Sequence, residues 1–455
     1  GYTFQPVLPG WAFGVRLETT FKERRNLLLE KLKNKDARLG VIGLGYVGLP
    51  LALEFAQAGF HVIGFDVSEE KVNGINAGKS HVRDVPSDAL AAMVQEGRIQ
   101  ATTNFDRLTE VDSINICVPT PLRKTRDPDV SYIVAAVEEI TKRLKPGTLV
   151  ILESTTYPGT TEELILPMLE SGLEVGKDFF LAFSPERVDP GNPKFQTHNI
   201  PKVVGGVTPA CTEAASALYG STLETVIPVS DTRVAEMVKL LENTFRSVNI
   251  GLVNEIALMC NSMDMNVWEV IDAAATKPFG FMPFYPGPGL GGHCIPIDPF
   301  YLSWKARQVG FEARFIELAG LINGFMPQHV VARITEALNE VGRPVKGSRI
   351  LVLGVAYKAD IEDVRESPAI DIIKHIQKLE GQVVYHDPFV HSLEEEGIDL
   401  HSEELTDELI RSADLVLITT QHKNTDYARV VKQAKVVFDS RNALKGMTAP
   451  NIRRL

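Results

Sequence analysis

Long apolar runs are absent from this chain of 455 residues. No stretch approaches the roughly 18 consecutive apolar residues that a membrane-spanning helix requires, and no apolar core follows the first residues as in a secretory signal. We therefore expect no membrane association. Hydrophobic residues make up 44% of the chain and charged residues 23%, which is typical of a globular protein in water. The length indicates two or three domains.

An excess of positive charge is absent as well. The chain has 47 basic and 58 acidic residues and a net charge of −11, which argues against a dedicated nucleic-acid binder. An anionic substrate is still compatible with this charge, because a few lysines and arginines can line one cleft. The four cysteines are scattered and lack the spacing of metal ligands. We expect no bound metal, reduced thiols and a cytoplasmic location.

Short apolar runs alternate with amphipathic stretches from Leu39 to Val229, and again from Ser348 onward. This alternation is typical of βαβ units, which build a parallel sheet. The expected strands are Leu39–Ile42, His61–Phe65, Ser113–Val118, Thr148–Leu152, Phe179–Phe183, Lys202–Val204, Thr225–Val229, Ser348–Gly354, Val383–His386, Asp414–Thr419 and Val436–Phe438.

The pattern changes after Ser230. Apolar residues at helical spacing predict one long helix from Thr232 to about Met263, capped by Ser230 or Asp231. We predict an α/β fold of two doubly wound, Rossmann-like domains joined by a central all-helical domain, with this helix as its spine. A long apolar helix needs a partner surface, which favours a dimer. The predicted segments are an N-terminal extension without recognisable chemistry (1–36), a dinucleotide domain (37–230), the helical domain (231–338) and a second Rossmann-like domain (339–455).

The run Gly43-Leu44-Gly45-Tyr46-Val47-Gly48 follows the first predicted strand and opens a helix. Such glycines allow a tight turn, the approach of a pyrophosphate and close packing of helix on strand. A flavin site or a structural coincidence is the alternative. Asp66, at the end of the second strand, can accept a hydrogen bond from a ribose 2′-OH and repels a 2′-phosphate, so NAD is favoured over NADP.

Cys294 stands in the run Pro288-Gly289-Leu290-Gly291-Gly292-His293-Cys294-Ile295-Pro296-Ile297-Asp298-Pro299. A lone cysteine is most often a small buried hydrophobe, but the flanking glycines indicate an accessible loop. An accessible thiol beside a dinucleotide oxidant indicates oxidation through a sulfur-bound intermediate.

Further candidates flank the predicted strands and the long helix. Lys239 and Asn243 share one helix face and could stabilise an oxyanion, or they are a polar stripe on a surface helix. Glu186 is a candidate general base, or an exposed loop carboxylate. Lys358 and Arg365 are phosphate or carboxylate contacts, or parts of an ordinary charged loop.

Together these motifs resemble the UDP-glucose/GDP-mannose dehydrogenase family, in its order and spacing from about Leu39 to the C-terminus. The run around Cys294 is most similar to the UDP-N-acetylglucosamine 6-dehydrogenases of that family, since glucose-type members have a serine where this chain has His293. The resemblance implies Cys294 as the nucleophile, with Lys239 and Asn243 at the oxyanion and Asp298 in a proton relay. It further implies Thr155 at the catalytic water and Glu186 as the base of thioester hydrolysis. The implied NAD contacts are Gly43, Gly45, Tyr46, Val47, Gly48, Asp66, Pro119, Thr120, Glu153, Thr155 and Arg365, and the implied substrate contacts are Glu186, Arg187, Lys239, Asn243, Gly291 and Lys358.

The resemblance implies a reaction in which a sugar C6 hydroxymethyl becomes a carboxylate while two NAD are reduced. UDP-N-acetylglucosamine is the favoured substrate, and UDP-glucose, UDP-N-acetylgalactosamine, UDP-N-acetylmannosamine and GDP-mannose are alternatives. A nucleotide-sugar-binding protein without turnover is the alternative outside enzymes. A homodimer or larger homo-oligomer and a role in polysaccharide biosynthesis are also implied. One departure stands out: glucose-type members carry a second glutamate where this chain has Pro190.

Overall fold

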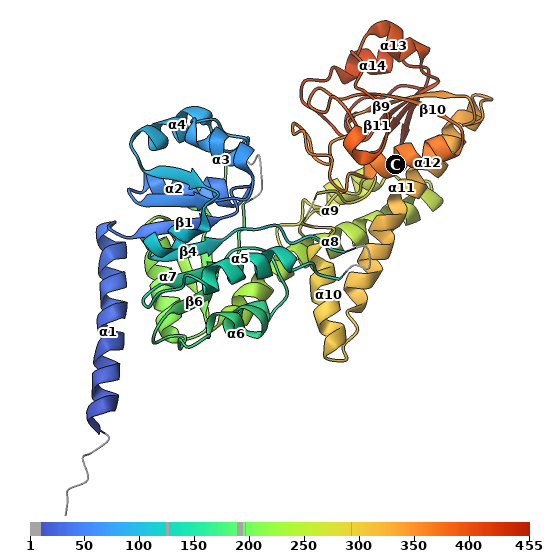
Figure 1. Ribbon diagram of the computed structural model, residues 1–455. Helices are drawn as coiled ribbons and strands as arrows, with labels where there is room; N and C mark the ends of the chain where they lie inside the picture. Colours follow the sequence, from blue (N-terminus) through green and yellow to red (C-terminus); the bar gives the residue numbers. More distant parts are fainter. Residues whose placement is uncertain (1–10, 124–126, 189–193, 196, 293) are drawn as a thin grey trace, which may run out of the picture. The chain divides into compact units, whose positions relative to one another are not determined.

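The computed structural model describes residues 11–123, 127–188, 194–195, 197–292 and 294–455, with the backbone alone for 11–20. The chain forms two compact units, Gly1–Leu240 and Leu241–Leu455. Each unit is built around one sheet (Figure 1).

The first unit contains an eight-stranded sheet in the order β3-β2-β1-β4-β5-β6-β7-β8. All neighbouring pairs are parallel except β6 and β7. Because β2 and β4 lie on opposite sides of β1, the strand order reverses there, and open α/β sheets bind ligands at such a point. The strands are β1 (Arg38–Ile42), β2 (His61–Phe65), β3 (Ile99–Thr102), β4 (Ser113–Ile116), β5 (Leu149–Leu152), β6 (Phe180–Phe183), β7 (Lys202–Gly206) and β8 (Val226–Pro228).

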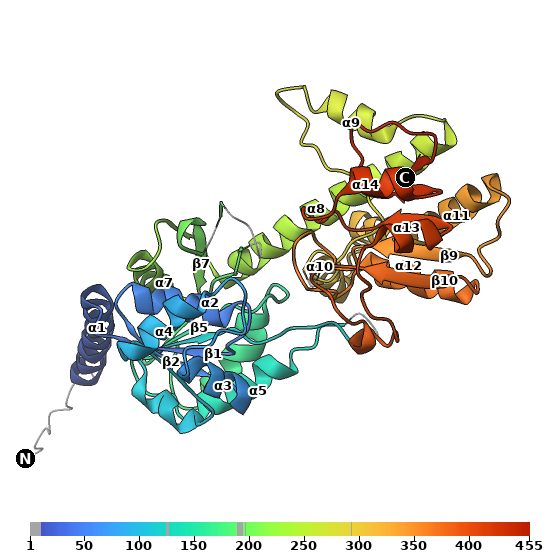
Figure 2. The same cartoon turned by 90° about the horizontal axis from the view of Figure 1, so that it is seen from above.

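Both faces of this sheet are buried, since successive strand residues point to opposite sides. In β5, Leu149 and Ile151 join one core while Val150 and Leu152 join the other. Figure 2 shows helices on both sides of the strands. The helices of this unit are α1 (Trp11–Asn34), α2 (Gly48–Gln57), α3 (Glu69–Asn76), α4 (Ser87–Gln95), α5 (Ser131–Thr141), α6 (Leu166–Leu169) and α7 (Pro209–Gly220).

The N-terminal segment contributes more to the fold than its sequence indicated. Helix α1 runs alongside the first unit (Figure 1), and Leu28 and Leu32 are buried in the core shared with α7. Phe21 packs on Phe180, with ring centroids 6.4 Å apart. Leu28 and Leu32 are four residues apart and share one helix face, but the surrounding charges of residues 21–36 hid this short apolar stripe.

Helix α8 (Thr232–Ser262) is the predicted long helix, and the Asp231 carboxylate accepts the Val234 N–H as its cap. It begins in the first unit and ends in the second. In the second unit Gly251 of α8 lets Ala319 approach, because a Cβ there would lie 3.1 Å from the Ala319 Cα. The other helices before the second sheet are α9 (Val267–Ala274), α10 (Asp298–Gln308) and α11 (Arg314–Glu340).

The second unit has a five-stranded parallel sheet in the order β10-β9-β11-β12-β13. Helix α12 covers one face, and α13 and α14 cover the other (Figure 1). The predicted pair of doubly wound sheets is thus confirmed, while the edge strands β3 and β13 were not predicted. The elements are β9 (Arg349–Leu353), α12 (Pro368–Lys378), β10 (Gln382–His386), α13 (Asp407–Ser412), β11 (Leu415–Ile418), α14 (Tyr427–Gln433), β12 (Val437–Asp439) and β13 (Ile452–Arg454).

Candidate active site

The glycine turn after β1 is shaped for a close approach of a ligand. Gly43 has a φ of +88°, and a Cβ there would lie 2.5 Å from the Cys117 carbonyl oxygen. A Cβ at Gly48 would lie 1.8 Å from the Gly43 oxygen, so only glycine lets α2 begin here. At Gly45 the same test meets no atom within 4 Å. Two glycines therefore serve the turn and its packing, while the third leaves open space at the positive end of α2.

Asp66 links the end of β2 to this turn. Its carboxylate accepts the Leu44 N–H and the Ser68 N–H, each at 2.9 Å, and lies 4.0 Å from the Lys71 ammonium. Each carboxylate oxygen has room for a further hydrogen bond, and the residue keeps 8% of its surface exposed. The next two residues of the predicted contact set, Tyr46 and Val47, lie beside Gly45 and are exposed and half-buried.

The second sheet repeats this arrangement but closes it. Gly354 follows β9 with a φ of +80°, and Asp387 follows β10. Asp387 accepts four backbone N–H groups, two of them from Val355 and Ala356 in the turn, and also the Nε2–H of buried His422 at 3.0 Å. Because His422 and the backbone use its acceptor sites, Asp387 is not available to a ribose. The fit to a dinucleotide is therefore specific to the first sheet.

The Asp387–His422 pair has an additional effect on the loop that carries Lys358. His422 Nδ1 accepts the Asp360 N–H at 3.0 Å, so the ring is bonded through both nitrogens. Burial alone would raise the pKa of Asp387, but the His422 hydrogen bond and the backbone donors lower it. The loop after β9 is thus fixed at both ends by one buried, hydrogen-bonded Asp–His pair.

Residues after β4 and β5 occupy the same carboxyl edge as the glycine turn. Pro119 is exposed, and Thr120 and Thr155 are half-buried. Glu153, by contrast, is only 1% exposed. It accepts hydrogen bonds from the Asn115 amide, the Tyr219 hydroxyl and the Lys202 ammonium. Its predicted contact with the cofactor stays a prediction.

Glu236 on α8 holds the loop that follows Thr155. Its carboxylate accepts the Gly159 N–H at 2.5 Å and, at 2.9 and 2.7 Å, the N–H and hydroxyl of Thr161. Gly159 has a φ of +103°, and Thr156 and Thr160 share a hydroxyl hydrogen bond of 2.6 Å. Burial raises the pKa of Glu236 to about 7. No local pattern indicates this role of Glu236, because the bonded partners lie 75 and 77 residues away in the sequence.

Glu186 lies in a positively charged setting. One of its oxygens accepts the N–H groups of Arg187 and Val188, and the other lies 3.6 Å from Lys202. Burial alone would raise its pKa, but Lys202, the Val188 N–H and Lys239 outweigh burial and lower it. Two predicted residues, Glu186 and Lys239, are therefore brought together in the first unit. Arg187 donates to the Pro201 carbonyl at 2.7 Å.

Asn243 lies one turn after Lys239 on α8, and its amide donates a hydrogen bond to the Asp298 carboxylate. Both side chains are buried, with exposures of 6% and 3%. Asp298 is the first residue of α10, and its N–H donates to the Cys294 carbonyl at 2.8 Å. The Cys294 side chain is half-buried and forms no disulfide. The second unit therefore holds three predicted residues as one connected group.

The glycine-rich approach to Cys294 packs on the loop after β9. A Cβ at Gly291 would lie 2.5 Å from the Tyr357 Cβ, and one at Gly292 would lie 2.9 Å from its ring. The Gly292 N–H donates to the Arg365 carbonyl at 3.0 Å. The side chain of Arg365 pairs with Asp363, and Lys358 is half-buried. Of the sequence-derived positions, Pro190 and His293 lie outside the described residues.

Arg441 is a candidate that the sequence analysis missed. It follows β12, its Nε donates to the Thr419 carbonyl at 2.9 Å, and its guanidinium lies against Gly287, where a Cβ would be 2.7 Å from Nη1. Burial lowers its pKa to about 10. Among the described residues, no carboxylate forms an ion pair with the half-buried Arg441 side chain. This is a suitable place for an anionic ligand group.

Comparison with known proteins decides the family. The NAD binding domain of the UDP-glucose/GDP-mannose dehydrogenase family matches residues 37–223. The central domain of that family matches residues 233–324, and its UDP binding domain matches residues 351–446. The chain belongs to the UDP-glucose/GDP-mannose dehydrogenase family. The UDP-N-acetyl-D-glucosamine 6-dehydrogenase of Pseudomonas aeruginosa is 38% identical over 359 residues, covering 78% of this chain and 84% of that protein. The UDP-N-acetyl-D-mannosamine dehydrogenase of Pyrococcus horikoshii is 36% identical over 416 residues, covering 90% and 96%.

Solved structures in the UDP-glucose/GDP-mannose dehydrogenase family agree with the fold. The UDP-D-ManNAc dehydrogenase from Pyrococcus horikoshii superposes with a TM-score of 0.83 at 34% identity, covering 92% of this chain and 98% of that one. As a member of this family the chain is an NAD-dependent nucleotide-sugar dehydrogenase. The open space at Gly45 and the Asp66 carboxylate beside the turn are compatible with NAD. Among the described helices, none is both long and apolar enough to cross a bilayer.

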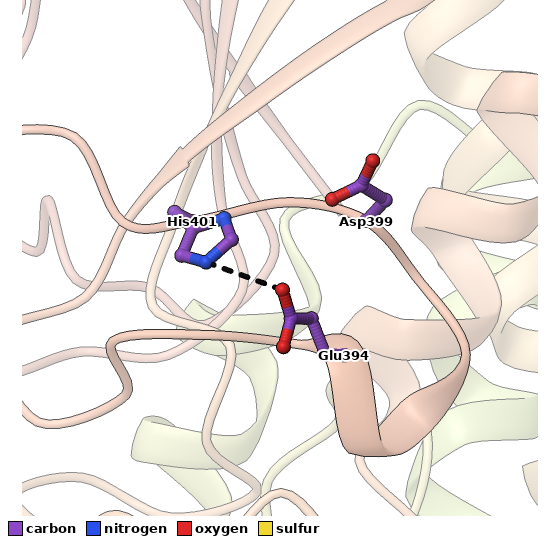
Figure 3. A group of neighbouring side chains, drawn as sticks. All are labelled: Glu394, Asp399 and His401. Atoms are coloured by element: carbon purple, nitrogen blue, oxygen red, sulfur yellow. Dashed lines mark ion pairs between the residues drawn. The ribbon is translucent and has the colours of Figure 1, made fainter.

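One cluster lies outside this constellation. Glu394, Asp399 and His401 bring one ligand atom each within 4.8 Å of one another (Figure 3). His401 Nε2 is 3.5 Å from a Glu394 oxygen. All three residues are exposed, and exposed acidic groups commonly meet without a metal, so the cluster reads as an ordinary surface ion pair.

Proposed function

We propose that this member of the family oxidises the C6 hydroxymethyl group of a UDP-N-acetylhexosamine to the uronic acid, with UDP-N-acetylglucosamine as the favoured substrate. The observation that carries the proposal is the buried Asn243–Asp298 hydrogen bond on the turn that holds Cys294. It fixes an amide and a carboxylate, and the backbone N–H of Asp298 bonds to the carbonyl of half-buried Cys294. An amide donor, a carboxylate and a thiol are the groups that a covalent oxidation needs.

The reaction removes four electrons. NAD, bound at the first sheet, supplies the hydride acceptor in each of the two oxidations. Cys294 attacks the aldehyde carbon after the first oxidation, and the new carbon–sulfur bond gives a thiohemiacetal. The second oxidation turns it into a thioester. Water then cleaves the carbon–sulfur bond and releases the carboxylate and the thiol, so the reactive aldehyde is held on the protein throughout.

Lys239 and Asn243 supply the positive charge and the N–H that stabilise negative charge on the reacting oxygen. Removal of one such donor typically costs about 100- to 1,000-fold in rate. Asp298 holds the Asn243 amide in position and can pass the proton that the thiol or alcohol releases. Both side chains are buried, which strengthens the hydrogen bond between them.

Glu186 is the proposed base of thioester hydrolysis, and Thr155 orders the attacking water. A base must be ionised to accept a proton, and the lowered pKa keeps Glu186 ionised at neutral pH. Thr155 lies in the loop that Glu236 fixes through Gly159 and Thr161. Glu153 and Arg365 remain proposed contacts of the cofactor.

The second unit is proposed to bind the nucleotide of the sugar. Arg441 offers a buried guanidinium beside the glycine-rich loop, and Lys358 offers an ammonium on the loop after β9. A diphosphate carries negative charge that matches the two cations. The matched UDP-binding domain, residues 351–446, supports this assignment.

An acetamido group at C2 is supported by the relatives. The similar enzymes of Pseudomonas aeruginosa and Pyrococcus horikoshii are named for N-acetyl sugars that differ in configuration at C2. We favour UDP-N-acetylglucosamine as the substrate because the run around Cys294 is most similar to the UDP-N-acetylglucosamine 6-dehydrogenases. UDP-N-acetylmannosamine, UDP-N-acetylgalactosamine, UDP-glucose and GDP-mannose are the competing substrates.

We also propose a homodimer formed by the helices of the second unit. Large apolar side chains are exposed on one side of α11, where Phe315, Leu318 and Phe325 are exposed by 77%, 51% and 46%. Exposed apolar patches of this kind mark protein–protein contacts. The proposed domain limits are those of the sequence analysis, at residues 36, 230 and 338. The four free cysteines support a cytoplasmic location.

The test is a panel of nucleotide sugars with matched C2-acetamido and C2-hydroxyl members, in which NADH and uronate are both counted. We expect two NADH per sugar and the highest kcat/KM with UDP-N-acetylglucosamine. Cys294→Ala should bind NAD and the sugar but release no uronate, with Cys260→Ala as the control for a buried thiol. A ratio near one NADH per sugar, or uronate from Cys294→Ala, would refute the covalent scheme. No NADH with any sugar would indicate a binding protein.

A further inference from the structure

Lys202 is a buried lysine that no part of the proposed mechanism uses. It begins β7 and is 4% exposed. Its ammonium lies 2.5 Å from a Glu153 oxygen, 3.6 Å from a Glu186 oxygen and 5.2 Å from the centroid of the Tyr219 ring. A buried ammonium is costly unless it is paired, and here two carboxylates and an aromatic face surround it.

The partners of Lys202 hold it in one place. Glu153 also accepts hydrogen bonds from Asn115 and Tyr219. Glu186, on the opposite side, is fixed by the N–H groups of Arg187 and Val188 at 2.6 and 2.7 Å. Lys202 therefore cannot leave Glu186 without leaving Glu153 unpaired in the core.

The titratable groups around Glu186 come from four parts of the first unit. Lys202 stands on β7, Lys239 on α8, Glu153 after β5, and the Cys117 thiol after β4. Burial, with the charge of Glu153, raises the pKa of Cys117 well above its ordinary value, so it stays neutral. Burial would lower the pKa of Lys202, but Glu153 and Glu186 outweigh burial and raise it. Two lysines thus balance two carboxylates.

We propose that Lys202 is a positioning residue that sets the protonation of Glu186, and thereby the pH range in which the thioester on Cys294 is hydrolysed. The inference rests on the proposed function. Glu153 opposes this effect in part, because its negative charge offsets some of the attraction between the Lys202 ammonium and the Glu186 carboxylate. Lys202 touches neither substrate nor cofactor in this scheme.

The direction of each change follows from the charges. Loss of the ammonium in Lys202→Met removes an attraction, so Glu186 holds its proton to a higher pH. An opposite charge at such a distance lowers a carboxyl pKa by about 1 to 3 units. The acid limb, which is the pH below which the hydrolysis rate falls, should therefore move to higher pH by that amount. Glu153→Gln removes a competing negative charge, so the acid limb should move down.

The experiment measures the steady-state rate of uronate release from pH 3.5 to 8. Intact mass spectrometry follows the thioester on Cys294 in parallel. Lys202→Met should accumulate more thioester than the wild type at pH 5 after a normal burst of NADH, because only hydrolysis is slowed. The double variant Glu153→Gln/Lys202→Met leaves no unpaired buried charge and should fold where the single variant does not. Its acid limb should lie between those of the two single variants.

Lys142→Met is the matched control, since Lys142 forms an exposed ion pair with Glu139 in the same unit. Its acid limb should coincide with that of the wild type. Acid limbs that coincide in the wild type, Lys202→Met and the double variant would overturn the inference, even if the rates fall. Failure of the wild type to form uronate would instead refute the proposed function itself, and the two failures are therefore distinguishable.

Discussion

The carboxyl group of Glu236 should make the first unit less stable as the pH rises. Its pKa is raised from 4.5 to about 7 in the folded protein. Between these values the folded chain binds more protons than the unfolded chain, so the free energy of unfolding falls as pH increases. A difference of about 2.5 units at 1.36 kcal/mol per unit gives about 3 kcal/mol. The loss occurs between pH 4.5 and pH 7 and is complete above that window.

Glu236→Gln isolates this contribution. The amide does not titrate, and its poorer match to the Gly159 and Thr161 donors adds a destabilisation that is the same at every pH. We expect the stability difference between the wild type and Glu236→Gln to shrink by about 3 kcal/mol from pH 4.5 to pH 8. For a unit of this size that corresponds to roughly 6 to 12 °C in the midpoint of thermal unfolding.

The assay is thermal unfolding followed by circular dichroism at half-unit pH steps. Glu138→Gln is the control, because Glu138 is an exposed glutamate on α5 of the same unit. Its curve should run parallel to that of the wild type. Parallel curves for the wild type and Glu236→Gln would refute the reasoning, since they would mean that Glu236 does not titrate in this window.

Two further predictions concern the second unit. Arg441→Met should raise the KM for the nucleotide sugar by about 10- to 100-fold, the cost of one or two charge-assisted hydrogen bonds, and leave the KM for NAD unchanged; an unchanged sugar KM in steady-state kinetics would remove Arg441 from the site. The wild type should sediment as a dimer at micromolar concentration and Phe315→Ser/Phe325→Ser as a monomer, with exposed Phe279→Ser as the control; a monomeric wild type would contradict the dimer.

Local patterns predicted the parts of the fold that depend on neighbours in the sequence. The glycine turn, the long helix α8 and the apolar central strands β1, β2 and β5 each carry their own periodicity. The edge strands β3 and β13 escaped notice because they are short and half-polar, as edges exposed to water can be. Leu28 and Leu32 were missed because two leucines within a charged run form too small a pattern.

Residues of the candidate site could be predicted only where they stand in a recognisable local motif. Cys294, Asp66 and the glycines stand in recognisable runs. Lys202 reads as the polar start of a strand, and only the folded chain brings it to Glu153 and Glu186, which precede it by 49 and 16 positions. Arg441 likewise became a candidate only because its guanidinium lies against Gly287, which is far away in the sequence. Such long-range pairs leave no periodic signal in one sequence.

The Asp387–His422 pair limits the chemistry as a whole. Because the acceptor sites of Asp387 are occupied, the described residues offer one dinucleotide turn in each chain, whereas the proposed reaction removes two hydrides from each sugar. If the proposed scheme holds, the reduced coenzyme leaves and a second NAD binds while the partly oxidised sugar is bonded to the Cys294 sulfur. The proposed reaction therefore requires exchange of coenzyme at one site between the two oxidations, and not two coenzymes bound at the same time.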